Sequence, residues 1–539
     1  MDIRKRTILK VFRKYSYSLS PDAIEFLEGI LDNHEISDEE VEHSMETLAK
    51  EYNKQDDASM KVSLEILQRV YQTLQESGER SAVERDIIDP ESHLYFVDAF
   101  DMPRWHWSHE RGTFERATAP LTMSGSPESR VMAVRDRLNI IRQCILRNEH
   151  FAPSTLPSRD RERLVTLKST KQLLGRPGDR FLLLGMLAHN KEGKLCIEDA
   201  DGSVTLDFSK LDEPGDGLFT EGCFALVEGE YTEDASLEII AIGQPPCEPR
   251  EVSRSIYGHI DFLGKGSTSL MEDTQFALRV RNELPDLHFF FLSDVWLDHP
   301  QTLSGLQKLF DNCIDNSFIP KLIVLCGNFT THSLVHGESR DLQRYQESFD
   351  ALADLVASYP LITRYTHFVL VPGPLDPTVN STLPRMHLMS SFTSRLRTKI
   401  PKLHLASNPC RIKFFNQEIV VFREDTMSRM LRNIVGVKPD ARSDDLKRFL
   451  VQSILDQSHL SPFTINIQPV LSDYDHALRL YPLPTVVVLA DKYDRFKITY
   501  TGCHVFNPGR FVGTSSFTFS AYKPAESNSE ECVLDMEEE

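Results

Sequence analysis

The hydrophobic positions of residues 1–78 recur every three or four residues, as they do along one face of a helix. Ser20-Pro21 places an N-cap before a proline at the first helical position, and Ser37-x-x-Glu40 is a capping box for a further helix. Another amphipathic stretch, residues 62–74, stops at Ser77-Gly78. Together with a helix around Ile8 and Phe12, this pattern predicts a bundle of about four short helices. Its apolar residues are needed to hold the bundle together, so we predict no chemistry there.

Residues 79–175 have a weaker pattern, and we expect a linker that contains one helix, residues 127–147. Ser126-Pro127 opens that helix with the same cap and proline arrangement. Its apolar side chains are spaced three and four apart, which predicts a single core-facing stripe. The stripe consists of Val131, Val134, Leu138, Ile141 and Ile145.

The aromatic and basic cluster Arg104-Trp105-His106-Trp107 permits two interpretations. Stacking surfaces beside cations are what single-stranded nucleic acids bind. The cluster could equally pack the linker against its own domain, and this is the interpretation that we favour.

Residues 176–250 change to short alternating runs separated by turns, which predicts five strands. A longer connection, residues 209–221, falls where a five-stranded OB barrel has its linking segment. Such barrels often bind single strands through a basic groove, but the second and third strands here carry mainly acidic side chains. We therefore expect a barrel that docks a protein. The predicted strands are residues 181–188, 195–198, 204–208, 223–230 and 237–242.

After a connecting segment, residues 251–285, the pattern of residues 286–523 is that of an α/β domain. Its continuous apolar runs predict strands that are buried on both faces, and residues 342–357 and 444–457 predict helices between them. The fold class is thus a multidomain α+β protein with a helical bundle, an OB barrel and an α/β domain. A site in such a domain is expected at the carboxyl ends of the strands. The apolar runs are residues 288–292, 322–325, 368–371, 418–422 and 485–489.

Composition narrows the possible functions. The 60 Lys and Arg against 80 Asp and Glu give a net charge of −20, which argues against a surface that mainly neutralises nucleic-acid phosphates. The 9 cysteines include no Cys-x-x-Cys pair, so neither a zinc knuckle nor a disulfide framework is predicted. Without a long apolar run or a signal-peptide core, we expect a soluble, intracellular protein with no membrane partner. The basic start, residues 1–14, and the acidic tail, residues 524–539, are expected to be solvated chain.

Short polar signatures follow the predicted strands of the α/β domain. They read Leu292-Ser-Asp-Val-Trp296, Leu325-Cys-Gly-Asn-Phe329, Val371-Pro-Gly-Pro-Leu-Asp376 and Leu489-Ala-Asp-Lys-Tyr493. This series resembles the calcineurin-like metallophosphoesterase family, whose strand ends hold two metal ions beside a phosphate ester. The resemblance implies a β-sandwich core with flanking helices.

Most of that family's metal ligands are missing at the matching positions. Asp294 matches the first aspartate, but Trp296 replaces a histidine, and an indole has no lone pair for a metal. Asn328 replaces the bridging aspartate, whose charge a neutral amide cannot supply. Pro374 stands where the family has an asparagine ligand, and Leu375 stands where it has the general-acid histidine. Asp491 and Tyr493 occupy the positions of a histidine pair, while the aspartate that follows the general acid is retained as Asp376.

The resemblance therefore implies an inactive domain with no catalytic residue, no metal and no cofactor. The alternative is a metal-dependent phosphodiesterase or nuclease with a degenerate site, in which Asp491 substitutes for a lost ligand. Two weaker motifs lie elsewhere. The segment Gly264-Lys-Gly-Ser-Thr268 lacks the glycine spacing of a phosphate loop and is expected to be a flexible loop, and His459 is expected to pack at a helix end.

An OB barrel directly before a phosphoesterase-like domain without metal ligands is a specific pairing. It resembles the B-subunit family of replicative DNA polymerases. The resemblance is carried by residues 289–298, 326–329, 371–377, 407–412, 421–425, 459–462 and 490–494, with residues 98–104 and 222–226 upstream.

That resemblance implies a non-catalytic accessory subunit of a nuclear replicative polymerase. The barrel and the inactive domain would bind the C-terminal, cysteine-rich domain of the catalytic subunit. Residues 1–78, which in this family resemble the lid of an ATPase module, would link the polymerase to the replicative helicase and GINS. Direct contact with DNA is expected to be weak or indirect.

Overall fold

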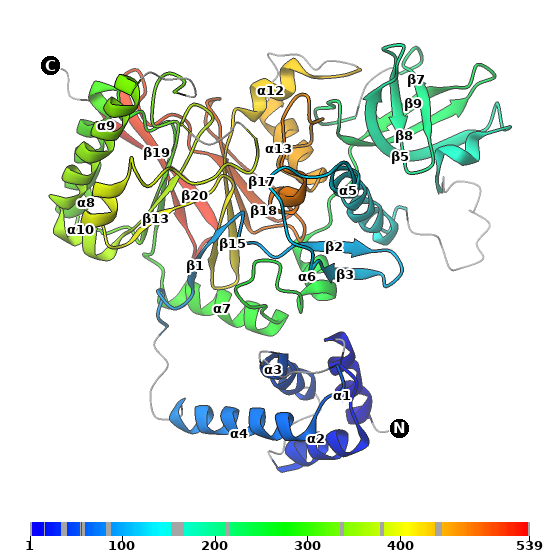
Figure 1. The fold of residues 1–539 in the computed structure, drawn as a ribbon, viewed down its shortest axis with the longest axis horizontal. Helices are drawn as coiled ribbons and strands as arrows, with labels where there is room; N and C mark the ends of the chain where they lie inside the picture. Colours follow the sequence, from blue (N-terminus) through cyan, green and yellow to red (C-terminus); the bar gives the residue numbers. More distant parts are fainter. Residues whose placement is uncertain are drawn as a thin grey trace.

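The computed structural model describes residues 3–15, 17–33, 40–53, 55, 60–81, 88–151, 166–211, 215–334, 339–377, 382–436 and 445–536. A small helical module, a barrel and a larger body built on two sheets make up this part of the chain (Figure 1). No helix among the residues described is both long enough and apolar enough to span a bilayer.

The helical module has its own hydrophobic core, as the sequence predicts. Phe12, Leu27, Met45 and Leu67 are fully buried at its centre. Ser20 accepts a hydrogen bond from the backbone N–H of Ala23 at 3.3 Å, which confirms the predicted N-cap. The helices are α1 (Ile3–Lys14), α2 (Pro21–Asn33), α3 (Val41–Asn53) and α4 (Leu64–Ser81).

Two predictions about this module are corrected. Helix α4 continues past Ser77-Gly78 to Ser81, because a glycine costs only about 1 kcal/mol relative to alanine inside a helix and does not by itself end it. The basic start is not solvated chain but helix α1, in which Lys14 pairs with Glu46 at 2.7 Å. The start of the predicted capping box lies outside the described residues.

All five predicted strands of the OB barrel are present. The sheet order β5-β6-β7-β9-β8 closes through pairing of β5 with β8, so the barrel encloses a core that includes Phe181, Ile197 and Val227. The short strand β4 (Leu167–Lys168) extends the sheet beside β5. The barrel strands are β5 (Arg180–His189), β6 (Leu195–Glu198), β7 (Ser203–Asp207), β8 (Phe224–Tyr231) and β9 (Ser236–Gly243).

The body is a sandwich of two six-stranded sheets. Alternate residues of the central strands point between the sheets, such as Phe291, Val324 and Val488, and the intervening ones pack under helices. This burial on both faces is why the strands read as continuous apolar runs. The first sheet consists, in order, of β13 (Leu403–Leu405), β12 (His367–Val371), β11 (Leu322–Cys326), β10 (Phe289–Leu292), β19 (Ser516–Lys523) and β20 (Asn528–Asp535). The second consists of β1 (Leu94–Asp98), β14 (Cys410–Phe414), β15 (Gln417–Arg423), β16 (Val486–Ala490), β18 (Cys503–Asn507) and β17 (Phe496–Tyr500).

Helices cover the outer faces of both sheets (Figure 1). Leu306, Phe349 and Leu396 pack on the first sheet, and Met427 and Leu450 pack on the second. The helices on the first sheet are α8 (Pro300–Asp315), α9 (Ser339–Ala357), α10 (Pro360–Tyr365) and α11 (Ser394–Lys399), and those on the second are α12 (Thr426–Arg432) and α13 (Leu446–Asp456).

Two segments expected to lie outside the folded domains belong to the sheets. Strand β1, within the predicted linker, pairs antiparallel with β14 and buries Leu94 and Val97. Strand β20, within the predicted acidic tail, pairs along its length with β19. Its charged side chains fit an edge strand, where they face water and discourage further pairing. The linker also forms β2 (Trp105–Ser108), β3 (Thr113–Arg116) and the predicted helix, α5 (Pro127–Arg147).

The helical module lies against the connecting segment of the body, below α7 in Figure 1. Lys50 pairs with Glu272 at 2.6 Å, and the rings of Tyr15 and His259 meet edge to face with centroids 6.0 Å apart. The connecting segment forms α6 (Arg250–Tyr257) and α7 (Leu270–Glu283), and Glu272 also closes the capping box of α7 with Ser269.

Candidate site at the carboxyl ends of the body strands

Side chains from both sheets meet where strands of the body end. Asp294 follows β10 and Asn328 follows β11, whereas Arg423 is the last residue of β15 in the opposite sheet. Asp294 is 2% exposed and Arg423 is 0% exposed, so the site is closed to water. A buried carboxylate and a buried guanidinium are each costly to desolvate alone, and here they face each other.

Arg423 occupies the centre of this site with four acceptors around its guanidinium. One Nη donates to Asp294 Oδ1 at 2.7 Å, and the other donates to Asp425 Oδ1 at 2.9 Å and to the Ala490 carbonyl at 3.3 Å. The Nε–H donates to the Gly327 carbonyl at 2.6 Å. Arg423 therefore ties together the ends of β10, β11, β15 and β16.

The charges in this site are balanced within the protein. Although burial alone would lower it, the pKa of Arg423 is raised by Asp294 and then by Asp425. For Asp425, burial raises the pKa, and Arg423 outweighs it and holds the pKa below its usual value. The guanidinium thus supplies the positive charge that a retained aspartate requires in a buried position.

Asn328 does not act as a free metal ligand. Its side-chain N–H donates to Asp294 Oδ1 at 3.1 Å, and its Oδ1 accepts from the Leu375 backbone N–H at 2.8 Å. Both ends of the amide are therefore used to position neighbouring loops.

Asp376 holds the loop after β12. It accepts hydrogen bonds from the backbone of Gly373 at 2.7 Å and Phe329 at 2.8 Å, and from the Tyr345 hydroxyl at 3.0 Å. Burial raises the pKa of this carboxyl to about 6, against the lowering effect of these hydrogen bonds. Its three donors all belong to the protein, and Asp376 serves to fix the loop.

Asp491 caps a helix. Its carboxylate accepts from the backbone N–H of Met427, in the first turn of α12, at 2.8 Å, and from that of Tyr493 at 2.9 Å. Such a carboxylate satisfies donors that the helix leaves unpaired at its start. The sequence interpretation of Asp491 as a substitute metal ligand has no support in these contacts.

The remaining predicted positions offer little to a cation. The indole N–H of Trp296 is buried without an acceptor among the described residues, and the Arg510 guanidinium lies over its ring at 5.8 Å. Pro374 and Leu375 are half-buried and have no side-chain ligand atom. No group of three or more His, Cys, Asp or Glu in the described chain is arranged to hold a metal. The donor set around Asp294, which includes a guanidinium, does not fit a pair of metal ions.

Arg423 is the functional position that the sequence interpretation missed. It stands directly after the apolar run of β15, where a residue this polar is rarely fully buried without a partner. The sequence did contain a signal for this ion pair. It places a basic residue at the end of one buried strand and a retained aspartate at the end of another.

The other motifs have structural roles. Trp105 donates its indole N–H to the Asp261 carbonyl at 3.0 Å, and Trp107 packs edge to face on Phe114, so the aromatic cluster packs the linker on itself and against the connecting segment. His459 is 2% exposed, and its Nδ1 accepts from the Ser461 backbone at 3.0 Å, as expected for a packing residue.

An apolar groove separates α5, the barrel and the body. The predicted stripe on α5 is buried only at its C-terminal half, because Val131 and Val134 remain 50% and 38% exposed. Ile465, from the body, is 43% exposed on the same groove. The groove is lined by Val134, Met186, Phe224, Phe463, Ile465 and Val470.

Comparison with known proteins identifies the family. Residues 289–497 match the family model for the B subunit of DNA polymerases alpha and epsilon, and residues 127–246 match that of the DNA polymerase epsilon subunit 2-like OB-fold domain. DNA polymerase epsilon subunit 2 of Homo sapiens is 35% identical over 540 residues, which cover 98% of each chain. The chain belongs to the DNA polymerase epsilon B-subunit family. This confirms the B-subunit family resemblance of the sequence.

Members of the DNA polymerase epsilon B-subunit family from distant organisms are also similar. The B subunit of Arabidopsis thaliana is 31% identical and is covered over 97% of each chain, and that of Schizosaccharomyces pombe is 35% identical over 79% of this chain and 74% of that protein. Among solved structures, an archaeal phosphodiesterase covers 46% of this chain with 11% identity and a TM-score of 0.24, too low to carry an argument.

Proposed function

We propose that the protein is a non-catalytic accessory subunit of the DNA polymerase epsilon complex, acting in DNA replication in the nucleus. Membership of the B-subunit family supports the complex. The proposal that the subunit is non-catalytic depends on the ion pair of Arg423 with Asp294 at 2.7 Å. A guanidinium that neutralises the retained aspartate leaves the site without the unpaired anionic ligands that phosphoester hydrolysis by metals requires.

The alternative function, a metal-dependent phosphodiesterase or nuclease with a degenerate site, is tested directly. We expect purified protein to contain less than about 0.1 equivalent of manganese or zinc and to show no phosphodiester hydrolysis. Stoichiometric metal together with hydrolysis that Asp294→Asn abolishes would establish the enzyme instead.

The apolar groove is the proposed docking place of the catalytic subunit's C-terminal, cysteine-rich domain. Val134 and Ile465 expose apolar surface there, although side chains of this kind are normally buried. The groove lies between α5, the barrel and the body, so one partner could contact all three. The acidic composition, net charge −20, also suits a protein partner better than DNA, whose contact we propose to be weak or indirect.

The helical module is the proposed link to the replicative helicase and GINS. Its core is closed on itself, and its described contacts with the body include the Lys50–Glu272 ion pair and the ring contact of Tyr15 with His259. We accordingly propose four units: residues 1–81, the barrel of residues 166–250 with α5 packed on it, the connecting segment, and the two-sheet body that includes β1 and β20. Their boundaries can be tested by limited proteolysis.

Co-purification with the catalytic subunit tests the docking proposal. We expect Val134→Glu and Ile465→Glu each to weaken capture of the catalytic subunit's C-terminal domain at least tenfold, because each buries a charge at the contact. Leu174→Glu is a matched control, since Leu174 is 72% exposed and lies outside the groove. If both groove variants capture the domain as the wild type does, with unchanged thermal stability, the docking site lies elsewhere on the protein.

A further inference from the structure

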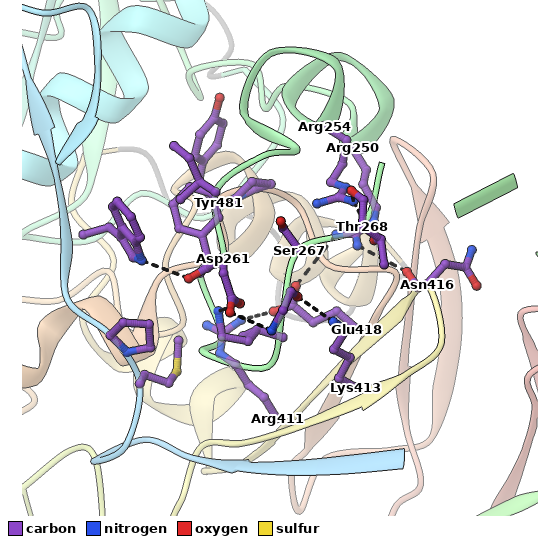
Figure 2. A pocket seen from close by; sticks show the side chains of 18 of the residues that line it. Arg250, Arg254, Asp261, Ser267, Thr268, Arg411, Lys413, Asn416, Glu418 and Tyr481 are labelled. Atoms are coloured by element: carbon purple, nitrogen blue, oxygen red, sulfur yellow. Dashed lines mark hydrogen bonds and ion pairs between the residues drawn. The ribbon is translucent and has the colours of Figure 1, made fainter. Parts of the chain in front are cut away.

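A basic pocket lies between α6, the loop of residues 261–268 and β14 (Figure 2). Arg250 and Arg254 enter it from α6, while Arg411 and Lys413 enter from β14, with Ser267 and Thr268 between the two pairs. Such a concentration of cations is unexpected in a chain of net charge −20. The cationic side chains lining the basic pocket are Arg250, Arg254, Arg411, Lys413 and Arg479.

Two of these cations have carboxylate partners outside the pocket lining, Arg254 with Asp273 at 2.8 Å and Arg479 with Asp136, so only the other three depend on the carboxylates of the pocket itself. Glu418 serves two guanidinium groups, because Arg411 hydrogen-bonds to it and Arg250 lies 3.8 Å from it. The Lys413 ammonium donates to the neutral carbonyls of Lys265 at 3.1 Å and Gly266 at 2.7 Å. Carbonyl oxygens satisfy hydrogen bonds but leave the positive charge in place.

Asp261, the other acidic residue of the basic pocket, is already used. Its carboxylate accepts from the backbone N–H groups of Leu263 and Lys265, each at 3.2 Å, and of Gly266 at 2.6 Å. The loop of residues 261–268 therefore wraps its N–H groups around its own aspartate. A ligand would have to bind on the cationic side chains beside the loop rather than inside it.

Donors remain available in the basic pocket. Arg411 is 4% exposed, and its Nε–H has no acceptor among the residues described. The Lys413 ammonium has three N–H donors, of which the two carbonyls use two. A buried donor without an acceptor is costly, so this arrangement favours an added oxyanion.

Burial lowers the pKa of two cations of the basic pocket. For Arg250, attraction to Glu418 opposes the effect of burial, and a smaller repulsion from Arg254 adds to it. For Lys413, attraction to Asp261 opposes burial, and a smaller repulsion from Arg254 adds to it. A bound anion would add to the attraction that offsets the cost of burying these charges.

We propose that the basic pocket binds a phosphate group, either as free inorganic phosphate or as a phosphomonoester. A tetrahedral oxyanion can accept from the Lys413 ammonium on one side and from guanidinium groups on the other, and the Ser267 hydroxyl lies at the same surface. Guanidinium and ammonium groups are the side chains that recognise phosphate most strongly. This inference is independent of the proposed docking groove.

Thermal stability of the full-length chain, titrated with sodium phosphate against sodium chloride at equal ionic strength, tests the proposal. We expect a saturable rise of the melting temperature in phosphate alone. Lys413→Gln keeps donors for the two carbonyls but removes the charge, and should raise the half-saturating phosphate concentration at least tenfold. Lys413→Arg keeps the charge and should stay within about threefold of the wild type. Lys191→Gln, on the exposed turn after β5, is the remote control and should change nothing.

A second variant keeps the proposal falsifiable if Lys413→Gln fails to fold. Ser267→Asp places a carboxylate at the surface of the pocket, where it competes with phosphate, and should abolish the phosphate response in a folded protein. A peptide with one phosphoserine, compared with inorganic phosphate, distinguishes the two sources: tighter binding of the peptide indicates a phosphorylated partner. The proposal is overturned if neither probe stabilises the wild type beyond chloride, or if Lys413→Gln and Ser267→Asp respond as the wild type does.

Discussion

Replacing Arg423 by methionine tests whether the guanidinium stands in for a lost cation. The side chain is 0% exposed and donates to two carboxylates and two carbonyls, so Arg423→Met leaves Asp294 buried without a counter-charge. Breaking a buried ion pair by removing one partner costs about 3–5 kcal/mol, and we expect a loss of about 4 kcal/mol in the free energy of unfolding.

The companion variant Asp294→Asn should cost less. Arg423 keeps its contact with Asp425 in that variant, and one charge-assisted hydrogen bond is lost, which is worth about 2 kcal/mol. In the double variant no unpaired carboxylate remains at position 294, because both charges of the pair are gone. We therefore expect the double variant to lose about 4 kcal/mol, so that the coupling between the two positions is about 2 kcal/mol.

Urea titration followed by tryptophan fluorescence measures these losses. Trp296 lies in the body and Trp105 packs against the connecting segment, so the signal follows the part of the protein that contains the site. Arg448→Met is the control, since the pair of Arg448 with Asp216 is half exposed and worth less than about 1 kcal/mol. Strictly additive losses in the double variant, or a loss for Arg423→Met no larger than for Arg448→Met, would refute the account of Arg423 as an internal counter-ion.

Further expectations concern three other contacts. Burial raises the pKa of Asp456 to about 7, so the folded protein favours the protonated carboxyl. The stability that this protonation contributes is lost as the pH rises from about 4 through about 7. Asp456→Asn should therefore gain about 2 kcal/mol relative to the wild type between about pH 5.5 and pH 7.5 in urea titrations, and a constant difference would contradict the assignment. Tyr345→Phe removes a donor of the buried Asp376 and should cost about 1–3 kcal/mol in the same assay; a loss within error would show that the bond to Asp376 contributes nothing. Lys50→Met removes the ion pair with Glu272 and should speed hydrogen exchange in α7 by about twofold to fivefold, whereas an unchanged rate would mean that this contact does not hold the module.

Local patterns were sufficient to predict the barrel and the central strands. All five barrel strands follow from alternation and turns, and the apolar runs at β10, β11, β12, β15 and β16 each became a buried strand. Strands β1 and β20 were missed because each depends on a distant partner, β14 for one and the edge strand β19 for the other. Neither a short run in a polar linker nor an acidic terminus reveals such pairing by its own composition.

The sequence predicted which strand ends form the candidate site but not the side chain at its centre. The match of Asp294 to the resembled family, and the departures at Trp296 and Asn328, can be read one strand at a time. The role of Arg423 could not, because it depends on β15 of one sheet ending beside β10 and β11 of the other. The capping role of Asp491 could not be predicted for a related reason: its partner, the start of α12, lies 64 residues away in the chain.

The ion pair with Arg423 explains how a carboxylate can be almost fully buried at position 294. If the guanidinium were absent, a buried aspartate would be a liability, and replacement by a neutral residue would stabilise the body. With Arg423 present, Asp294 fixes the end of β10 through Arg423 and the loop after β11 through Asn328. These strand ends are then held in place by bonds inside the protein, which is the kind of rigid scaffold that the proposed accessory subunit requires.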